Sequence, residues 1–153
     1  MSPRSLLLLL FFAAALAASP SLGQEYSEAG NRLTHLTVKG VPVTAEVVDT
    51  PDKVYLGLGR RQGLAEGRGM LFIIPTMGLQ AFCMRDMQFS IDIIWIADGK
   101  VAGVQPKMLP SDKGVFVSPV PVRLVLEVPG GFAGRHGIKT GDPVVLNLPS
   151  EPK

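Results

Sequence analysis

Glycine and proline occur too often along this chain for long helices to form between them. The 153 residues include 17 Gly and 13 Pro, of which 16 Gly and 11 Pro lie after residue 23. The segments between them are short, and several alternate apolar and polar residues, which is the pattern of half-buried strands. The spacing therefore excludes a helical bundle and favours a β-rich fold of short strands joined by turns.

The first 23 residues have the features of a secretory signal peptide. Arg4 precedes an apolar run from Leu6 to Leu16, which is shorter than the roughly 20 residues that a membrane-spanning helix needs. Small residues at 21–23 predict cleavage before Gln24; cleavage near residues 15–17, or retention as an uncleaved anchor, are the alternatives. No later stretch is long and apolar enough to span a membrane, so we expect a periplasmic or secreted protein.

The remainder divides into a flexible leader at 24–32, a single β-rich domain at 33–148 and a tail at 149–153. Thr50, Pro51 and Asp52 indicate the start of a short helix, and a single helical turn is expected at 132–136. Asp98-Gly99 is typical of a two-residue hairpin turn. We expect eight strands, over 33–39, 41–48, 69–74, 79–84, 91–97, 100–104, 122–128 and 144–148. This pattern predicts a mainly β fold, a compact β-barrel or β-sandwich.

Several classes of function lack their sequence signatures. There is no glycine-rich phosphate loop, no pair of histidines four residues apart and no CxxC pair, so we expect no cofactor and no metal site. Among the 15 Lys and Arg only Arg4 lies in the first 23 residues, which leaves 14 basic and 13 acidic residues and a formal charge of +1. A near-neutral domain does not favour nucleic-acid binding.

Cys83 is the only cysteine, so no disulfide can form within the chain. It lies between Phe82 and Met84 in an apolar stretch. This setting favours a buried thiol that packs as a small apolar side chain, rather than a catalytic nucleophile.

The candidate functional residues are charged side chains within apolar strands. Asp92 has apolar neighbours on both faces of its strand, so it needs either a cation, for which Arg85 is the nearest candidate, or several backbone donors. Glu127 shares a strand face with Arg123 and is either part of an ordinary solvated pair or part of a site. If Asp92 and Glu127 share one cleft, they could act as an acid and a base.

Three segments resemble the family of bacterial and archaeal proteins catalogued as domain of unknown function 192. They comprise Asp49-Thr50-Pro51 with Gly57-Leu58-Gly59-Arg60; Gly69-Met70-Leu71-Phe72 with Phe82-Cys83-Met84-Arg85-Asp86 and Ile91-Asp92-Ile93; and Val125-Leu126-Glu127-Val128-Pro129-Gly130-Gly131 with Gly137-Ile138 and Gly141-Asp142. The family pattern has Trp at position 83 and Asn at position 86, and this chain departs from both. The resemblance implies a β-rich domain, often preceded by a signal peptide, and brings no established activity.

We therefore expect an exported domain that binds a small ligand, with an anion as one option, or a protein partner, without catalysis. The candidate ligand-binding residues are Arg60, Met84, Arg85, Asp92 and Glu127. A hydrolase or lyase that uses Asp92 and Glu127, and a structural envelope module without a pocket, are the alternatives. The sequence does not predict the ligand or the oligomeric state.

Removal of the signal peptide can be tested directly. When the full chain is expressed in a bacterium, we expect the mature protein to begin at Gln24, because the small residues before it suit signal peptidase. N-terminal sequencing and the intact mass measure this. A protein that keeps Met1 and sediments with the membrane fraction would contradict the prediction.

Overall fold

The computed structural model describes residues 23–147, so the predicted signal peptide and the 149–153 tail lie outside the described residues, apart from Gly23. Its strands and helices are, in chain order, β1 (Leu33–Val38), β2 (Val41–Val48), α1 (Pro51–Leu56), β3 (Arg68–Gly78), β4 (Ala81–Phe82), β5 (Ile91–Ala97), β6 (Lys100–Met108), β7 (Phe116–Val117), β8 (Val122–Pro129), α2 (Phe132–Arg135) and β9 (Val144–Asn147). Within 23–147 neither helix is long and apolar enough to cross a membrane.

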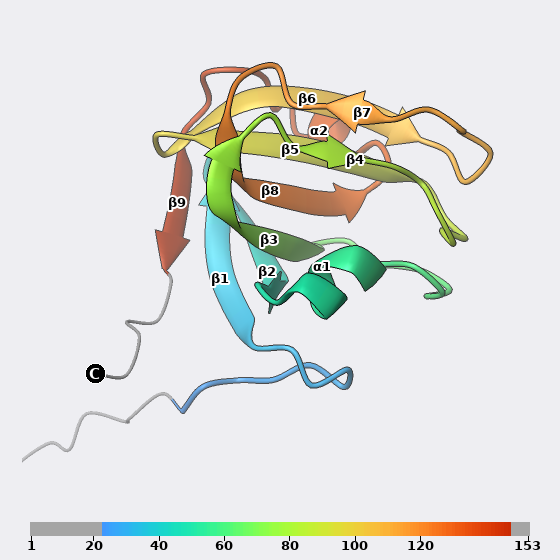
Figure 1. Cartoon of the computed structure of the whole chain (residues 1–153). Helices are drawn as coiled ribbons and strands as arrows, with labels where there is room; N and C mark the ends of the chain where they lie inside the picture. The colour runs from blue at the N-terminus through green and yellow to red at the C-terminus, as the bar shows by residue number, and fades with distance from the viewer. Residues whose placement is uncertain (1–22, 148–153) are drawn as a thin grey trace, which may run out of the picture.

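Seven strands form one curled sheet in the order β6-β5-β8-β3-β2-β1-β9, and β4 pairs with β7 in a small separate arm (Figure 1). Neighbouring strands are antiparallel except for β2 and β3, which run parallel. The sheet curls until its two edges approach, where Lys100 forms an isolated bridge with Pro143 and the Val101 N–H donates to the Asp142 carbonyl at 2.9 Å. The expected mainly β fold is confirmed, as a half-barrel.

The main differences from the expected strands occur around Pro75 and after Val104. β3 continues through the expected turn at 75–78, but its pairing with β8 shifts register between Ile73 and Gly78. This irregularity accommodates Pro75, which has no N–H to donate. β6 extends to Met108, which pairs with Ile91, and the two-residue strand β7 has no signal in the sequence.

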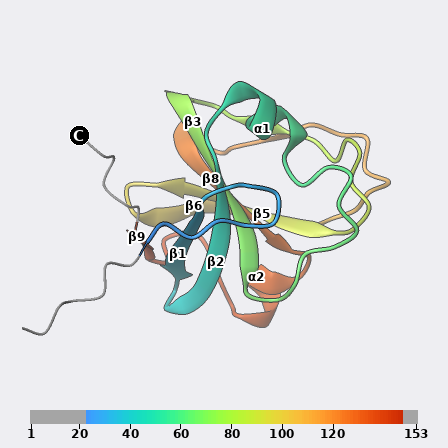
Figure 2. The ribbon, with the colours of Figure 1, turned by 90° about the horizontal axis from the view of Figure 1, so that it is seen from below.

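Two apolar layers cover opposite faces of the sheet. Figure 2 shows α1 on one side of the strands and α2 on the other, and we name each layer after its helix. Because side chains alternate along a strand, successive residues of β5 enter different layers. Ile94 and Ile96 pack in the α2 layer, with Phe132 and Ala133 of the helix. Ile93 and Trp95 pack in the α1 layer, with Leu58.

The segment 24–32, the predicted leader, contacts the domain through hydrogen bonds. Within the segment, Tyr26 and Arg32 form an isolated antiparallel β-bridge. The Asn31 side chain reaches the domain and donates to the Glu46 carboxylate at 2.8 Å. Arg61 donates to the same carboxylate at 2.9 Å. Although burial raises the pKa of Glu46, hydrogen bonds from Arg61 and Asn31 outweigh that effect and lower it to about 2. Glu46 therefore joins the leader to the segment after α1.

Asp92 is fully buried in the α2 layer and is satisfied by backbone donors. Its carboxylate accepts hydrogen bonds from the N–H groups of Lys107 at 2.7 Å, Gly131 at 2.8 Å and Ala133 at 2.8 Å. These donors belong to the end of β6 and to the start of α2. Of the two predictions for Asp92, the one that backbone donors satisfy its carboxylate is therefore confirmed. The predicted ion pair with Arg85 is wrong.

The structural role of Asp92 predicts a large effect on stability. Asp92→Ala leaves two buried N–H groups, of Gly131 and Ala133, and the part-buried N–H of Lys107 without an acceptor, so we expect it to lower the free energy of unfolding by about 3–5 kcal/mol. Urea denaturation measures the change. Asp112→Ala is the matched control: Asp112 also accepts a backbone N–H, from Leu109, but at an exposed site, and its loss should cost under about 1 kcal/mol. Equal effects of the two substitutions would contradict this role.

Candidate functional site

A cavity of about 370 Å³ lies between α1, the segment 80–87 and the strands β3 and β8. We call it the Glu127 cavity. It is lined by Val54, Tyr55, Leu56, Gly57, Leu58, Gly59, Phe72, Ile74, Gln80, Ala81, Phe82, Cys83, Arg85, Met87 and Glu127. Its volume lies within the range of small-molecule sites, and its walls are mainly apolar with few polar groups.

Glu127 is the one carboxylate among these lining residues. β8 places Glu127 beside Met70 of β3 and Ile93 of β5, and the residue is 6 % exposed. Within residues 23–147 no hydrogen bond or ion pair reaches its carboxyl group, and burial alone raises its pKa to about 8. The described part of the chain contains no fully shielded side-chain oxygen without a partner, so the Glu127 carboxyl must reach the open space of the cavity.

Aromatic side chains form the inner wall of the Glu127 cavity. The rings of Phe72 and Phe82 meet edge to face with centroids 5.0 Å apart, and Phe82 meets Trp95 in the same way at 5.6 Å. Gly57, with φ +52°, lies against the Phe72 ring: a Cβ atom there would stand 3.3 Å from Cζ. These contacts fix the shape of the wall, because both the ring cluster and the turn after α1 are tightly packed.

Arg85 and Tyr55 lie at the exposed mouth of the cavity and contact each other. The Arg85 guanidinium carbon is 3.9 Å from the centre of the Tyr55 ring, and Nη2 donates to the Tyr55 carbonyl at 3.1 Å. Arg85 forms no ion pair with Glu127. The mouth therefore carries a positive charge, while the carboxyl at the floor has no counter-ion among the described residues.

Cys83 is exposed and also lines the Glu127 cavity, so the expectation of a buried thiol was wrong. The side chain of its neighbour Phe82 enters the aromatic cluster and leaves Cys83 at the surface. Cys83 also lines a second cavity of about 490 Å³ with Met84, Arg85 and Asp86 on one side and Pro110, Asp112, Lys113 and Gly114 on the other. Among residues 23–147 no three His, Cys, Asp or Glu side chains are placed to hold a metal ion.

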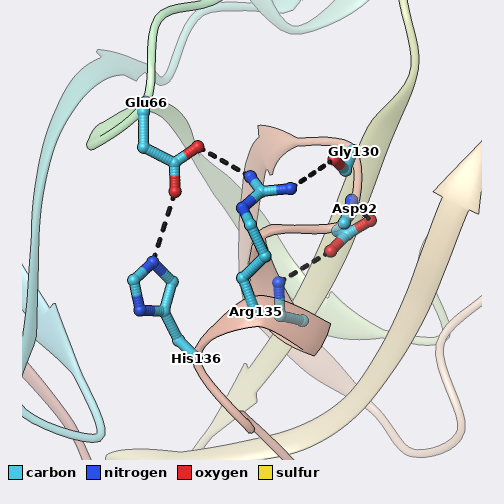
Figure 3. Close-up of polar contacts among 7 residues, drawn as sticks. Glu66, Asp92, Gly130, Arg135 and His136 are labelled. Carbon is cyan, nitrogen blue, oxygen red and sulfur yellow. Dashed lines mark hydrogen bonds and ion pairs between the residues drawn. The ribbon is translucent and has the colours of Figure 1, made fainter.

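A second group of polar side chains lies at α2 (Figure 3). Glu66 accepts from Arg135 at 2.6 Å and contacts the His136 ring at 3.2 Å, and Arg135 also donates to the Gly130 carbonyl. The hydrogen bond from Arg135 lowers the pKa of Glu66. Glu66 and Arg135 are exposed and His136 is half-buried, and the three side chains satisfy one another. This group therefore ties the segment before β3 to α2 rather than offering an open site.

The predicted site residues do not all converge. Arg85 and Glu127 line one cavity, and Met84 is buried in the α1 layer beside them. Arg60 is exposed and lies 3.8 Å from Asp86, outside the cavity.

Asp92 and Glu127 lie on opposite faces of the sheet. Asp92 stands opposite Val128, and Glu127 stands opposite Ile93, so the two carboxyls point into different layers. The acid and base pair is therefore excluded. The notion of a solvated pair for Glu127 and Arg123 is also wrong, because Glu127 is buried while Arg123 is exposed. Sequence reasoning missed Tyr55, Phe72 and Phe82, which contribute the mouth and wall.

Comparison with known proteins establishes the family. Residues 34–146 match DUF192, described as Uncharacterized ACR, so the chain belongs to this family and the resemblance in its sequence is confirmed. A search of curated proteins found no match.

Two solved structures share the fold. One, from Sinorhizobium meliloti and described provisionally as a transcription regulator, has 25% identity and a TM-score of 0.74, over 78% of this chain and 98% of that one. The other, a protein of unknown function from Novosphingobium aromaticivorans, has 28% identity and a TM-score of 0.76, over 82% of this chain and 94% of that one.

The buried carboxyl predicts an unusual dependence of stability on pH. The pKa of Glu127 is about 8 in the folded protein and near 4.5 in an unfolded chain, so its protonated form favours folding below pH 4.5. That contribution is lost as the pH rises toward 8. Relative to Glu127→Gln, we expect the wild type to lose roughly 3–5 kcal/mol of unfolding free energy between pH 4.5 and 8.

Urea denaturation at several pH values measures the difference. Glu66→Gln is the control, because Glu66 is exposed and its pKa is lowered, so it does not titrate in this window. Parallel pH profiles for the wild type and Glu127→Gln would show that the carboxyl is not desolvated.

Proposed function

We propose that this DUF192 protein binds a small, mainly apolar molecule in the Glu127 cavity and does so without catalysing a reaction. The observation that carries the proposal is the Glu127 carboxyl, which reaches the cavity and has no partner among residues 23–147. A buried polar group without a partner costs free energy, and a ligand that bonds it removes that cost.

The form of the cavity supports the same function. Apolar side chains from α1, β3 and β4 form its walls, and a single buried polar group lies at the floor. This combination gives a ligand both a surface to bury its hydrocarbon part and one directional contact. We also propose that the domain is exported, as the apolar run at 6–16 indicates, so that it meets its ligand outside the cytoplasm.

Regulation of transcription, the provisional description of the S. meliloti protein, is a weaker proposal for this chain. Binding to DNA depends largely on contacts between basic side chains and phosphates. The formal charge of +1 over residues 24–153 gives little support to such a surface.

Cys83 provides a direct test, because it lines the cavity and is the only thiol in the chain. We expect that a ligand at ten times its dissociation constant slows alkylation of Cys83 by N-ethylmaleimide about tenfold, since it covers the thiol. The rate is followed by intact mass, with a panel of small amines, alcohols and carboxylates as probes. Compounds that raise the melting temperature should be the ones that protect Cys83.

A cavity-filling substitution supplies the control. Ile74→Trp places a large ring in the cavity and should abolish protection, whereas Val145→Trp adds the same ring at an exposed position of β9 and should leave it unchanged. If no compound in the panel protects Cys83, or if protection persists in Ile74→Trp, the proposed function is wrong.

A further inference from the structure

The Glu127 cavity holds a buried carboxyl group that lacks a positive partner among the described residues. Its other titratable lining groups are Tyr55, Cys83 and Arg85. Arg85 is the only cation among the lining residues, and it is exposed and already stacked on the Tyr55 ring at the mouth. Within residues 23–147 no ion pair involves Glu127, and burial raises its pKa.

The remaining polar side chain at the cavity is engaged elsewhere. The Gln80 amide donates to the carbonyls of Thr76 and Val122, at 3.0 and 3.1 Å. Asp92, in the neighbouring strand β5, differs in this respect, because three backbone N–H groups donate to its carboxylate. The fold therefore provides donors for one buried carboxyl and leaves the other for something outside the described residues.

We propose that the ligand of the Glu127 cavity is a small organic amine, whose ammonium group bonds the Glu127 carboxylate while its hydrocarbon part lies against the aromatic wall. This inference rests on the proposed ligand-binding function and names the ligand class. An ammonium ion supplies both the hydrogen-bond donor and the positive charge that the carboxylate lacks. Aromatic rings on the same wall also favour a cation over a neutral group.

An anionic ligand fits the floor of the cavity less well. A carboxylate or phosphate placed beside Glu127 would face a second negative charge whenever Glu127 ionises. It would have to bind chiefly through Arg85 at the mouth, because Glu127 can donate a hydrogen bond to it only while protonated and repels it once ionised. The two ligand classes thus depend on different residues, which makes them separable by experiment.

Binding of an amine has a proton balance that can be measured. Near pH 7 Glu127 is protonated and the free amine is an ammonium ion, so formation of the ion pair releases one proton from Glu127 to solvent. The ammonium–carboxylate pair then forms without further proton transfer. Affinity should therefore be about tenfold higher at pH 7 than at pH 6, because a smaller share of the binding free energy is spent on ionising Glu127.

The experiment uses 2-phenylethylamine as the probe, with 2-phenylethanol and phenylacetate as analogues of similar shape. Isothermal titration calorimetry in two zwitterionic buffers of different ionisation enthalpy that both buffer at pH 6–7, PIPES and ACES, reports affinity and proton release together. We expect the amine to bind the wild type at least about tenfold more tightly than the alcohol, with proton release near one at pH 6–7. Glu127→Gln should lose both the preference for the amine and the proton release.

Further variants decide between the outcomes. Glu66→Gln, a carboxylate outside the cavity, should bind the amine as the wild type does. If phenylacetate binds more tightly than the amine, and Arg85→Gln but not Glu127→Gln abolishes its binding, the ligand is an anion and the inference fails while the ligand-binding function stands. If none of the three compounds binds and no panel compound protects Cys83, both fail. Circular dichroism of each variant confirms that it is folded.

Discussion

The fold depends on the Asp92 carboxylate, which joins parts of the chain that the sheet alone does not hold. Its two oxygens accept hydrogen bonds from the backbone N–H groups of Lys107, Gly131 and Ala133. Lys107 and Gly131 both have positive φ. Backbone in this conformation costs free energy, particularly at a residue such as Lys107, and persists only where its surroundings fix it. Asp92 therefore positions the end of β6 and the start of α2 at the α2 layer.

Glu127 lies in the same pair of strands but has the opposite role. Glu127 precedes Val128, the residue of β8 that pairs with Asp92. Because side chains alternate along a strand, Glu127 therefore points into the opposite layer from Asp92. There the chain offers it apolar neighbours and an opening, but no donor within 23–147. A buried carboxyl that weakens the fold as pH rises has no structural explanation here, whereas a ligand that bonds it provides one.

The sequence predicted the periodic features well and the three-dimensional ones poorly. Alternation and the Asp98-Gly99 turn located β1, β2, β5 and β8, because these signals are local. The burial of Glu127 was not predictable, because its strand alternates as a half-exposed strand does and only the packing of α1 and the segment 80–87 covers it. Cys83 was misassigned for a related reason: an apolar stretch contributes alternate residues to the core, and the choice between Phe82 and Cys83 depends on tertiary contacts.

Two family motifs that the sequence places far apart meet beside the Glu127 cavity. The Arg60 N–H donates to the Asp86 carbonyl at 2.8 Å, and both residues have positive φ, +66° and +58°. Asn and Asp both tolerate this conformation, so the departure from the family pattern at position 86 preserves the turn. Because Arg85 also contacts Tyr55 of α1, the segment 83–87 is joined both to α1 and to the turn that follows it. Strained backbone held in this way is expected where a preformed site has to keep its shape without a ligand.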